Sequence, residues 1–448
     1  PRAPPLSGRS SLAAMLTRDG SGAATLGGQR LSDLLDRERL PTPVYVYDVD
    51  GIVREAQALS GGFDGLDHLV AYAVKANSAG PILRALAREG VGADVVSGGE
   101  LELALACGVA PESIVMSGVG KTDAELDLAI GAGARGILSI HVESIEEIAR
   151  IDARARALAR RARLSFRINP GIEADTHAYI ATGHDEAKFG IPRAEVGLAM
   201  EAVDRSTSID LVGVSSHIGS QLTDTASYLS AARMLLDVAR AVEVAASGSG
   251  RPKLELVDFG GGFGIDYGSG CGAQPADFAR ALSSLVREVG RTDRRTLVEP
   301  GRALVAAHGV LCASVIGTKR ARPNEEERRW LVIDAGMNDL LRPALYQAVH
   351  RIEPLEHAPP AERAGIDMRV VGPVCESSDD FGTHRMPESA PARVLIRDVG
   401  AYGFTMASEY NGRAMPIEVF LSAGRVVDVL RPRSSNEWVR ARLGTRGA

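Results

Sequence analysis

A lysine closes an otherwise apolar run early in the chain, Ala71-Tyr72-Ala73-Val74-Lys75-Ala76-Asn77. A charged amine at the end of a buried strand is costly unless something uses it. A desolvated lysine loses its proton more readily and becomes a nucleophile suited to Schiff-base chemistry. A lysine at a strand end can also simply reach solvent. The segment therefore indicates a reactive site only if other polar groups gather around it.

A glycine-rich stretch, Gly260-Gly261-Gly262-Phe263-Gly264, is the second candidate segment. It lacks the glycine at the sixth position that a dinucleotide fingerprint requires. Without side chains, its backbone N–H groups can close on a phosphate. A second segment, Glu299-Pro300-Gly301-Arg302, adds a glycine and an arginine. We expect a phosphate site here, with a glycine turn that binds nothing as the alternative.

Short β-branched runs alternate with longer amphipathic stretches between about residues 69 and 305. Eight strand–helix repeats predict an α/β fold with a parallel (β/α)8 TIM-type barrel, and a doubly wound open sheet is the alternative. The predicted strands are residues 69–76, 92–97, 113–117, 136–142, 164–169, 211–219, 254–260 and 296–305.

Polar or glycine residues recur at the ends of six of these predicted strands. The carboxyl ends of barrel strands share one face, where functional groups gather. We therefore expect one site there, built from Lys75, Asp94, Arg167, His217, Gly260 and Glu299.

Glu299 indicates which cofactor such a site would take. A carboxylate beside a pyridine nitrogen keeps that nitrogen protonated, and a cationic ring is a stronger electron sink. Together with a Schiff-base lysine and a phosphate loop, this predicts pyridoxal 5'-phosphate and suits decarboxylation. His217 could stack on the ring, although a buried core histidine is the plainer interpretation of that residue alone.

The chain changes character after residue 310. Predicted strands at residues 329–334, 368–371, 392–398 and 417–421 are separated by turns, which indicates a mainly β domain. We expect three parts: residues 1–40, packed on the β domain or partly disordered; a barrel over 41–310; and a β-sandwich or barrel-like domain over 311–448.

Composition limits the possible partners. A formal net charge of -6 argues against a nucleic-acid-binding or anionic-membrane surface. No apolar run is long enough for a membrane span. The four cysteines, Cys107, Cys271, Cys312 and Cys375, include no close pair, so neither a metal site nor a disulfide framework is expected. A reducing, cytoplasmic setting is the simplest interpretation.

Several of these segments resemble the fold type III pyridoxal-phosphate decarboxylases, which share an alanine racemase-like barrel followed by a β domain. The resemblance covers about residues 40–430 and rests on residues 72–77, 217–221, 260–262 and 299–302. Downstream segments are similar to diaminopimelate decarboxylases in particular: residues 337–346, 400–403 and 408–411, and Cys375-Glu376-Ser377.

The resemblance implies roles in cofactor binding. Lys75 would bind the cofactor covalently, Glu299 would hold its pyridine nitrogen, and His217 would stack on its ring. Gly262 and residues 299–302 would hold the phosphate. The other implied contacts are Asp94, Arg167, Ser220, Gly260, Gly261, Gly301, Arg302 and Tyr402.

The resemblance also implies a substrate site. Arg302, Arg342 and Tyr346 match positions that grip a distal carboxylate, and Glu376 matches the position that pairs with a distal ammonium. Tyr402 would lie against both cofactor and substrate, and Cys375 would be the catalytic proton donor. Because Cys375 and Glu376 come from the neighbouring subunit in this family, the active unit would be at least a homodimer.

The expected reaction is decarboxylation of meso-2,6-diaminopimelate to L-lysine and CO2, the last step of lysine biosynthesis. Arg342 and Glu376 supply the guanidinium and carboxylate that a second amino-acid head group requires. Alternatives are a same-fold decarboxylase for ornithine, arginine, carboxynorspermidine or a carrier-bound glutamyl group, a racemase, or a non-catalytic binding protein. The sequence departs from the family pattern at Ser378, where glycine is usual, and at Gly412-Arg413-Ala414.

Overall fold

The computed structural model describes residues 16–169, 188–217, 219–248, 250, 252–268, 273–320, 329–359 and 365–443. Cys271 and the first fifteen residues of the predicted N-terminal part lie outside them. The chain forms two compact units. One comprises Ile52–Ala306 with Gly400–Thr405, and the other comprises the chain up to Gly51, Ala307–Val399 and Met406–Ala448.

Eight parallel strands close into a barrel in the first unit, as the alternation of strands and helices predicts. Strand β9 pairs with both β11 and β8, so the sheet closes into a barrel. The short β10 (Ile191–Pro192) pairs with the end of β9. Around the barrel the order is β5 (His68–Ala73), β6 (Gly92–Val95), β7 (Ile114–Met116), β8 (Ser139–Val142), β9 (Ala162–Asn169), β11 (Ile209–Ser215), β12 (Leu256–Asp258) and β13 (Arg295–Val298).

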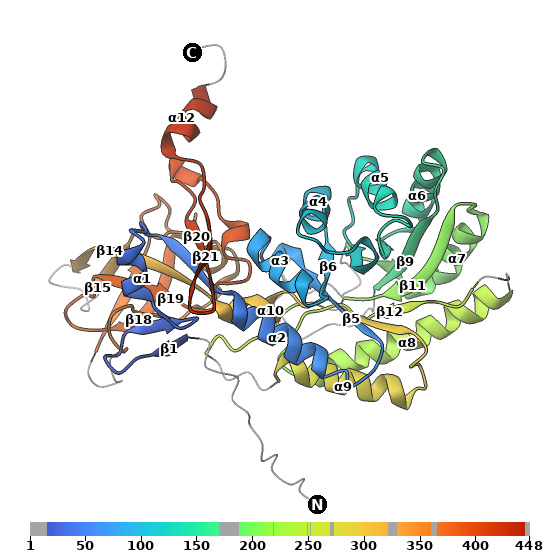
Figure 1. Ribbon diagram of the computed structural model, residues 1–448, viewed down its shortest axis with the longest axis horizontal. Helices are drawn as coiled ribbons and strands as arrows, with labels where there is room; N and C mark the ends of the chain where they lie inside the picture. Colours follow the sequence, from blue (N-terminus) through green and yellow to red (C-terminus); the bar gives the residue numbers. More distant parts are fainter. Residues whose placement is uncertain are drawn as a thin grey trace, which may run out of the picture. The chain divides into compact units, whose positions relative to one another are not determined.

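Helices follow the strands and lie around them (Figure 1). Ser97 and Ser144 cap helix N-termini by accepting backbone N–H groups, and Thr122 forms a capping box with Glu125. These helices are α2 (Val49–Gly61), α3 (Gly80–Arg88), α4 (Gly98–Ala106), α5 (Asp123–Gly131), α6 (Ile145–Ala157), α7 (Val196–Arg205), α8 (Thr225–Gly248) and α9 (Pro275–Glu288).

Apolar side chains from the strands form a buried cluster of Leu69, Ala71, Val115, Leu138, Val212, Leu256 and Leu297. A barrel interior filled in this way is a packed core and not a pore. The polar residues come later along the same strands, so they gather at the carboxyl ends.

Several of the predicted strands are too long, including the one predicted over 211–219, which ends at Ser215 and leaves His217 beyond it. Two of them matter most for the site. The strand predicted over 69–76 ends at Ala73, and Lys75 lies in a 3-10 turn, η1 (Val74–Ala76). The strand predicted over 296–305 ends at Val298, and α10 (Arg302–Val305) follows it. Pro300 explains the second break because it has no N–H for a ladder hydrogen bond. In both places the functional residue leaves the strand for a turn.

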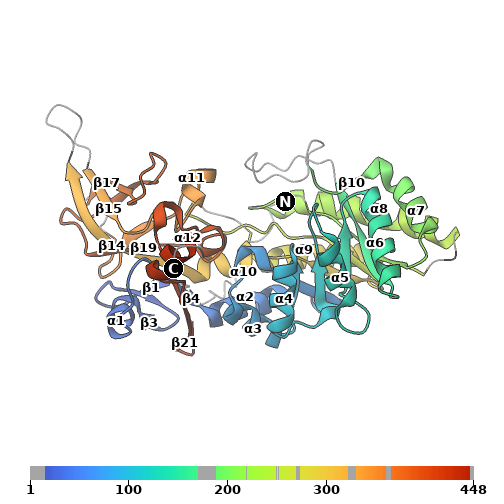
Figure 2. The same cartoon turned by 90° about the horizontal axis from the view of Figure 1, so that it is seen from above.

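The second unit is mainly β. Its large sheet runs β18-β17-β15-β14-β4-β20-β21, with β19 pairing β14 and β16 pairing β19. Figure 2 shows β14, β15 and β17 together. The bounds are β4 (Val44–Asp48), β14 (Gly309–Arg320), β15 (Arg329–Ile333), β16 (Ile352–Pro354), β17 (Ile366–Val371), β18 (Asp380–Met386), β19 (Arg393–Ile396), β20 (Ile417–Ser422) and β21 (Arg425–Leu430). Two short helices, α11 (Arg342–Tyr346) and α12 (Ser435–Leu443), belong to this unit.

Residues 16–40 form the small sheet β1 (Leu16–Arg18), β2 (Ala24–Leu26) and β3 (Gln29–Arg30), followed by α1 (Leu31–Arg37). Their apolar side chains share one core with β4, β14 and β20.

The limits of the two units differ from the predicted ones. The barrel was expected to begin at residue 41, yet β4 pairs with β14 and β20 in the other unit. Conversely, residues 400–405, which the sequence assigns to the β domain, belong with the barrel. No helix in the described part of the chain is both long and apolar enough to cross a membrane.

Candidate active site

Lys75 and Asp94 meet at the carboxyl end of β5 and β6. Lys75 Nζ donates a hydrogen bond to Asp94 Oδ2 at 2.8 Å, and the Asp94 side chain is fully buried. Burial would lower the pKa of Lys75, but Asp94, Tyr402 and Glu299 raise it above its ordinary value. Burial would likewise raise the pKa of Asp94, but Lys75 lowers it. The lysine is therefore held as a cation, with its amine at a fixed place.

Hydrogen bonds around Asn77 fix the turn that carries this lysine. Asn77 Nδ2 donates to the Gly400 carbonyl at 3.0 Å, and the Tyr72 hydroxyl donates to the Asn77 carbonyl at 2.9 Å. Tyr402 N donates to the Ala76 carbonyl at 2.7 Å. Tyr402 has φ 56°, a left-handed backbone conformation that costs energy for a bulky residue. Residues 400–405 are thus tied to the lysine turn.

The glycine stretch leaves no room for side chains. A Cβ at Gly261 would lie 2.0 Å from the Glu299 carbonyl oxygen, and one at Gly262 would lie 2.3 Å from the Gly219 carbonyl oxygen. Gly260 and Gly262 also have φ values of 64° and 91°, which glycine adopts most readily. The loop after β12 therefore packs backbone against backbone, which only glycine allows at these positions.

Arg302 lies near this loop, at the start of α10. Its side chain is buried and donates to the Ser220 hydroxyl at 3.0 Å and to the Tyr267 hydroxyl at 2.6 Å. Its guanidinium carbon also lies 5.0 Å from the centre of the Tyr402 ring. A Cβ at Gly301 would meet the Cβ atoms of Ala73 and Ala76 at 3.1 Å and 3.0 Å, so the start of α10 packs closely on the lysine turn.

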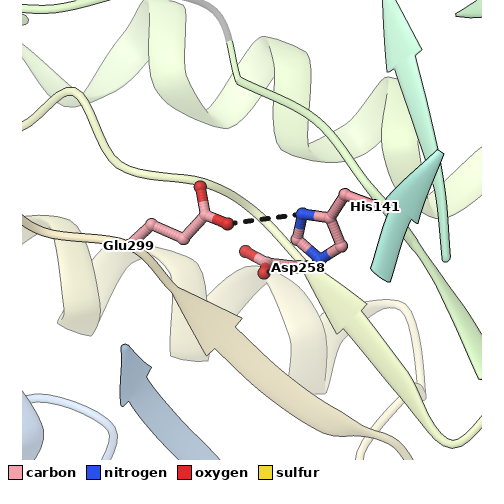
Figure 3. Close-up of side chains that lie close together, drawn as sticks. All are labelled: His141, Asp258 and Glu299. Carbon is pink, nitrogen blue, oxygen red and sulfur yellow. Dashed lines mark ion pairs between the residues drawn. The ribbon is translucent and has the colours of Figure 1, made fainter. Parts of the chain in front are cut away.

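Glu299 faces two other titratable groups inside the barrel mouth (Figure 3). Its Oε1 lies 3.6 Å from His141 Nδ1, and His141 Nε2 lies 3.6 Å from Asp258 Oδ2. Burial lowers the pKa of His141 to about 3, so the ring is neutral. Burial raises the pKa of Asp258 to about 7, and burial together with Asp258 and Asp94 raises the pKa of Glu299.

His217 and Arg167 lie in the same unit but make different contacts. His217 Nδ1 accepts the Gly261 N–H at 3.2 Å, and desolvation lowers the pKa of His217 to about 3. Arg167 donates to Glu143 Oε1 at 2.6 Å, so its guanidinium is held by an ion pair. Glu143 also accepts the Gly118 N–H at 3.0 Å, which anchors this pair to the loop after β7.

The predicted substrate and proton-donor residues belong to the other unit. Arg342 is buried at the start of α11, with its Nη1 2.9 Å from His350 Nε2. Tyr346 closes the same helix and is half-buried. Cys375 and Glu376 are exposed; Cys375 N donates to Asn411 Oδ1 at 3.1 Å, and Glu376 accepts the Tyr410 hydroxyl.

The sequence interpretation missed His141 and Asp258, although both had a recognisable signal. Asp258 is the last residue of β12, and His141 is the penultimate residue of β8. Polar residues at the carboxyl ends of barrel strands are candidates for the site. Lys121 and Glu147 were also missed: the lysine is buried and lies 3.1 Å from Glu147 Oε1.

Comparisons with known proteins identify the family that this chain resembles. The family described as "Pyridoxal-dependent decarboxylase, pyridoxal binding domain" matches residues 49–306. Diaminopimelate decarboxylase of Zymomonas mobilis is 38% identical over 413 residues, covering 89% of this chain and 94% of the relative. The enzyme of Vibrio cholerae is 40% identical over 385 residues, covering 86% and 88%.

A crystal structure of diaminopimelate decarboxylase from Helicobacter pylori complexed with L-lysine is similar throughout. Its TM-score is 0.82 at 36% sequence identity, covering 92% of this chain and 99% of that one. The family model covers the barrel unit, and the similar sequences and structure extend over most of the chain. This chain belongs to the pyridoxal-dependent decarboxylases, and within them to the diaminopimelate decarboxylase family.

Proposed function

We propose that this protein decarboxylates meso-2,6-diaminopimelate to L-lysine and CO2 with pyridoxal 5'-phosphate, as the last step of lysine biosynthesis. The observation that carries the proposal is the meeting of three features at one barrel face in a member of this family. These are the fixed amine of Lys75, the buried carboxyl of Glu299 and the side-chain-free loop at Gly260–Gly262.

The residues of the barrel mouth suit pyridoxal phosphate. Glu299 Oε1 is buried and has no hydrogen-bond partner among the described residues, so it offers an acceptor for a protonated ring nitrogen. We assign the phosphate to the loop at Gly260–Gly262, where glycine lets the backbone pack closely against the carbonyl groups of Glu299 and Gly219. When bound, pyridoxal phosphate supplies the electron sink for the electron pair that the departing carboxylate leaves behind.

Residues of the barrel would bind and orient the cofactor. Lys75 would be the covalent anchor, and Asp94 orients its amine through the 2.8 Å hydrogen bond. Glu299 would hold the ring nitrogen. His217 would lie against the ring, and its nitrogen is fixed by the Gly261 N–H. We assign Ser220, Gly301, Arg302 and Tyr402 to the same cofactor surface because they are joined by the Arg302 contacts.

The role that we propose for Arg167 is electrostatic. Its ion pair with Glu143 holds the guanidinium at 2.6 Å from a carboxylate. It also counts among the charges that act on Glu299 and His217. We therefore propose that Arg167 contributes positive potential to the cofactor site.

A substrate with a second amino-acid head group explains the remaining residues. Arg342, with Tyr346 beside it on α11, would bind a distal carboxylate, while Glu376 would bind a distal ammonium. Ornithine has no distal carboxylate for Arg342 to bind. Cys375 would donate the proton that replaces CO2, since a thiol is a workable acid near neutral pH.

We further propose a homodimer in the cytoplasm, with Cys375 and Glu376 serving the neighbouring subunit's barrel. Their exposure supports this arrangement. Mixing Lys75→Ala with Cys375→Ala subunits tests it, because each heterodimer then contains one intact site. A one-to-one mixture should recover about a quarter of wild-type activity in a two-fold symmetric dimer. Recovery of none would place both residues in the same subunit's site.

The decisive experiment for the reaction is CO2 release by the cofactor-loaded protein. meso-Diaminopimelate, ornithine, arginine and lysine are compared at equal concentration. Release from diaminopimelate alone establishes the proposed reaction. Release from another amino acid with none from diaminopimelate would keep the family and overturn the substrate.

A further inference from the structure

Two buried carboxyl groups, Asp258 and Glu299, lie close together in the barrel mouth. Asp258, Glu299 and His141 offer ligand atoms that all lie within 4.8 Å of one another, and all three residues are buried. Two buried carboxylates at such a separation cannot both ionise easily, so they share one proton. The neutral ring of His141 supplies no charge to prevent this.

The other charged groups around Asp258 and Glu299 already have hydrogen-bond partners. Lys75 is hydrogen-bonded to Asp94, and Arg167 is hydrogen-bonded to Glu143. Asp258 Oδ1 accepts the Gly260 N–H at 2.9 Å, whereas its Oδ2 and Glu299 Oε1 have no hydrogen-bond partner in the described part of the chain. The charged groups that act on Glu299 are Asp258 on β12, Asp94 on β6, Lys75 after β5 and Arg167 on β9. The neutral His141 on β8 and Tyr228 on α8 also face the two carboxyl groups.

We propose that Asp258 is a positioning residue whose charge, held beside neutral His141, keeps the cofactor's ring nitrogen protonated through Glu299. This inference rests on the proposed role of Glu299 and adds to it. In the cofactor-free chain the shared proton resides on Glu299. On binding, that proton moves from the Glu299 carboxyl to the ring nitrogen, leaving a carboxylate and a cation, with no net gain or loss of protons.

The physical reason is that a buried negative charge stabilises a nearby cation. In this role Asp258 contacts neither substrate nor cofactor. It acts through Glu299. The two ring nitrogens of His141 have different neighbours. Its Nε2 faces Asp258, and its Nδ1 lies 3.1 Å from the Ser117 hydroxyl. With Nδ1 accepting from Ser117, the Nε2–H would face Asp258 and favour its ionised form.

The test is a pH titration of the ring nitrogen in the cofactor-loaded full chain, followed by NMR with an isotope label in that nitrogen. Asp258→Asn keeps the acceptor for Gly260 N–H and removes only the charge. We expect the pH at which the ring nitrogen loses its proton to fall by about 1 to 3 units. Glu255→Gln is the matched control, since Glu255 stands just before β12 and pairs with Arg163 instead.

His141 variants separate its two nitrogens. His141→Gln can place an N–H near the Nε2 position and should retain much of the wild-type titration. His141→Asn reaches only the Nδ1 position and should lower the midpoint as Asp258→Asn does. A merely structural role for His141 would make these two variants alike in the titration, which would overturn its part in the inference.

The remaining outcomes distinguish the role of Asp258 from that of Glu299. An unchanged midpoint in Asp258→Asn, with protonation lost in Glu299→Gln, overturns this inference and leaves the proposed function standing. An unchanged midpoint in Glu299→Gln overturns the assignment of Glu299 itself. If Asp258→Asn does not retain cofactor, infrared spectra of the cofactor-free chain decide. The protonated-carboxyl band must then vanish at lower pH than in wild type, and a band that vanishes at the same pH refutes the role of Asp258.

Discussion

Lys75 and Asp94 are brought together by strand register: Ala73 of β5 pairs with Asp94 of β6, and the chain then turns so that Lys75 Nζ reaches Asp94 Oδ2 at 2.8 Å. The lysine is therefore not simply a charged residue at the end of a strand. Its amine is held toward the neighbouring strand β6 by a buried carboxylate, and its turn is fixed by Asn77 and residues 400–405.

Replacing Lys75 with alanine should abolish the visible absorption of covalently bound cofactor, because the proposed site then has no amine to form the bond. Lys253→Ala removes an exposed lysine and is the matched control. Absorption spectra of the purified, cofactor-treated proteins make the comparison. A wild-type spectrum in Lys75→Ala would show that another lysine holds the cofactor.

Asp94→Asn should make Lys75 reactive at lower pH. Asp94 is the main group that raises the pKa of Lys75 against the lowering effect of burial, so its neutralisation lowers that pKa. Only the neutral amine attacks an aldehyde. The pH midpoint for attachment of pyridoxal phosphate to the cofactor-free chain should therefore fall by roughly 1 to 3 units.

Asp210→Asn is the control for this titration, because Asp210 pairs with Arg161 near the start of β11. It should leave the midpoint where it is. A midpoint that rises in Asp94→Asn would mean that the aspartate activates the lysine and does not hold it as a cation.

The barrel was predictable because β-branched runs and amphipathic stretches alternate eight times, and a closed barrel is the usual result of that pattern. Lys75 and Glu299 were recognisable by their position at strand ends. The turn at Lys75 was not, because its hydrogen bonds come partly from residues 400–405. The placement of β4 also depends on pairing with β14 and β20, far along the chain.

The Asp258–His141 pair could not be inferred from the sequence for a different reason. Periodicity predicts which face of a strand is buried, but it does not predict which buried polar groups end within contact of one another across the barrel. In the sequence, the glycine run that follows Asp258 is a stronger signal than the single aspartate before it. Only the assembled barrel shows that Glu299 faces both residues.

Gly261→Ala should weaken cofactor binding severely. The new Cβ would lie 2.0 Å from the Glu299 carbonyl oxygen, so the backbone at Glu299 or the glycine loop must move. Either movement displaces a proposed contact to the ring nitrogen or to the phosphate. Equilibrium binding of pyridoxal phosphate, with circular dichroism to confirm folding, measures the loss.

Gly197→Ala is the matched control for that substitution. Gly197 lies in α7, and a Cβ there meets nothing within 4 Å. Alanine in the first turn of this helix should leave the fold intact or make it slightly more stable. Wild-type cofactor affinity in Gly261→Ala would mean that the loop can relax without disturbing the site.

Glu376→Ala should raise the KM for diaminopimelate roughly 10- to 100-fold, the effect of losing a charged hydrogen bond to a distal ammonium. Cofactor affinity should change little, because the proposed cofactor contacts are made by other residues. Steady-state kinetics and a cofactor titration separate the two effects. Glu388→Ala, at another exposed glutamate of the same unit, should alter neither. An equal loss of substrate and cofactor binding in Glu376→Ala would instead mean that the exposed segment at Cys375 and Glu376 supports the whole site, since removing one carboxylate would then disturb groups that it does not contact.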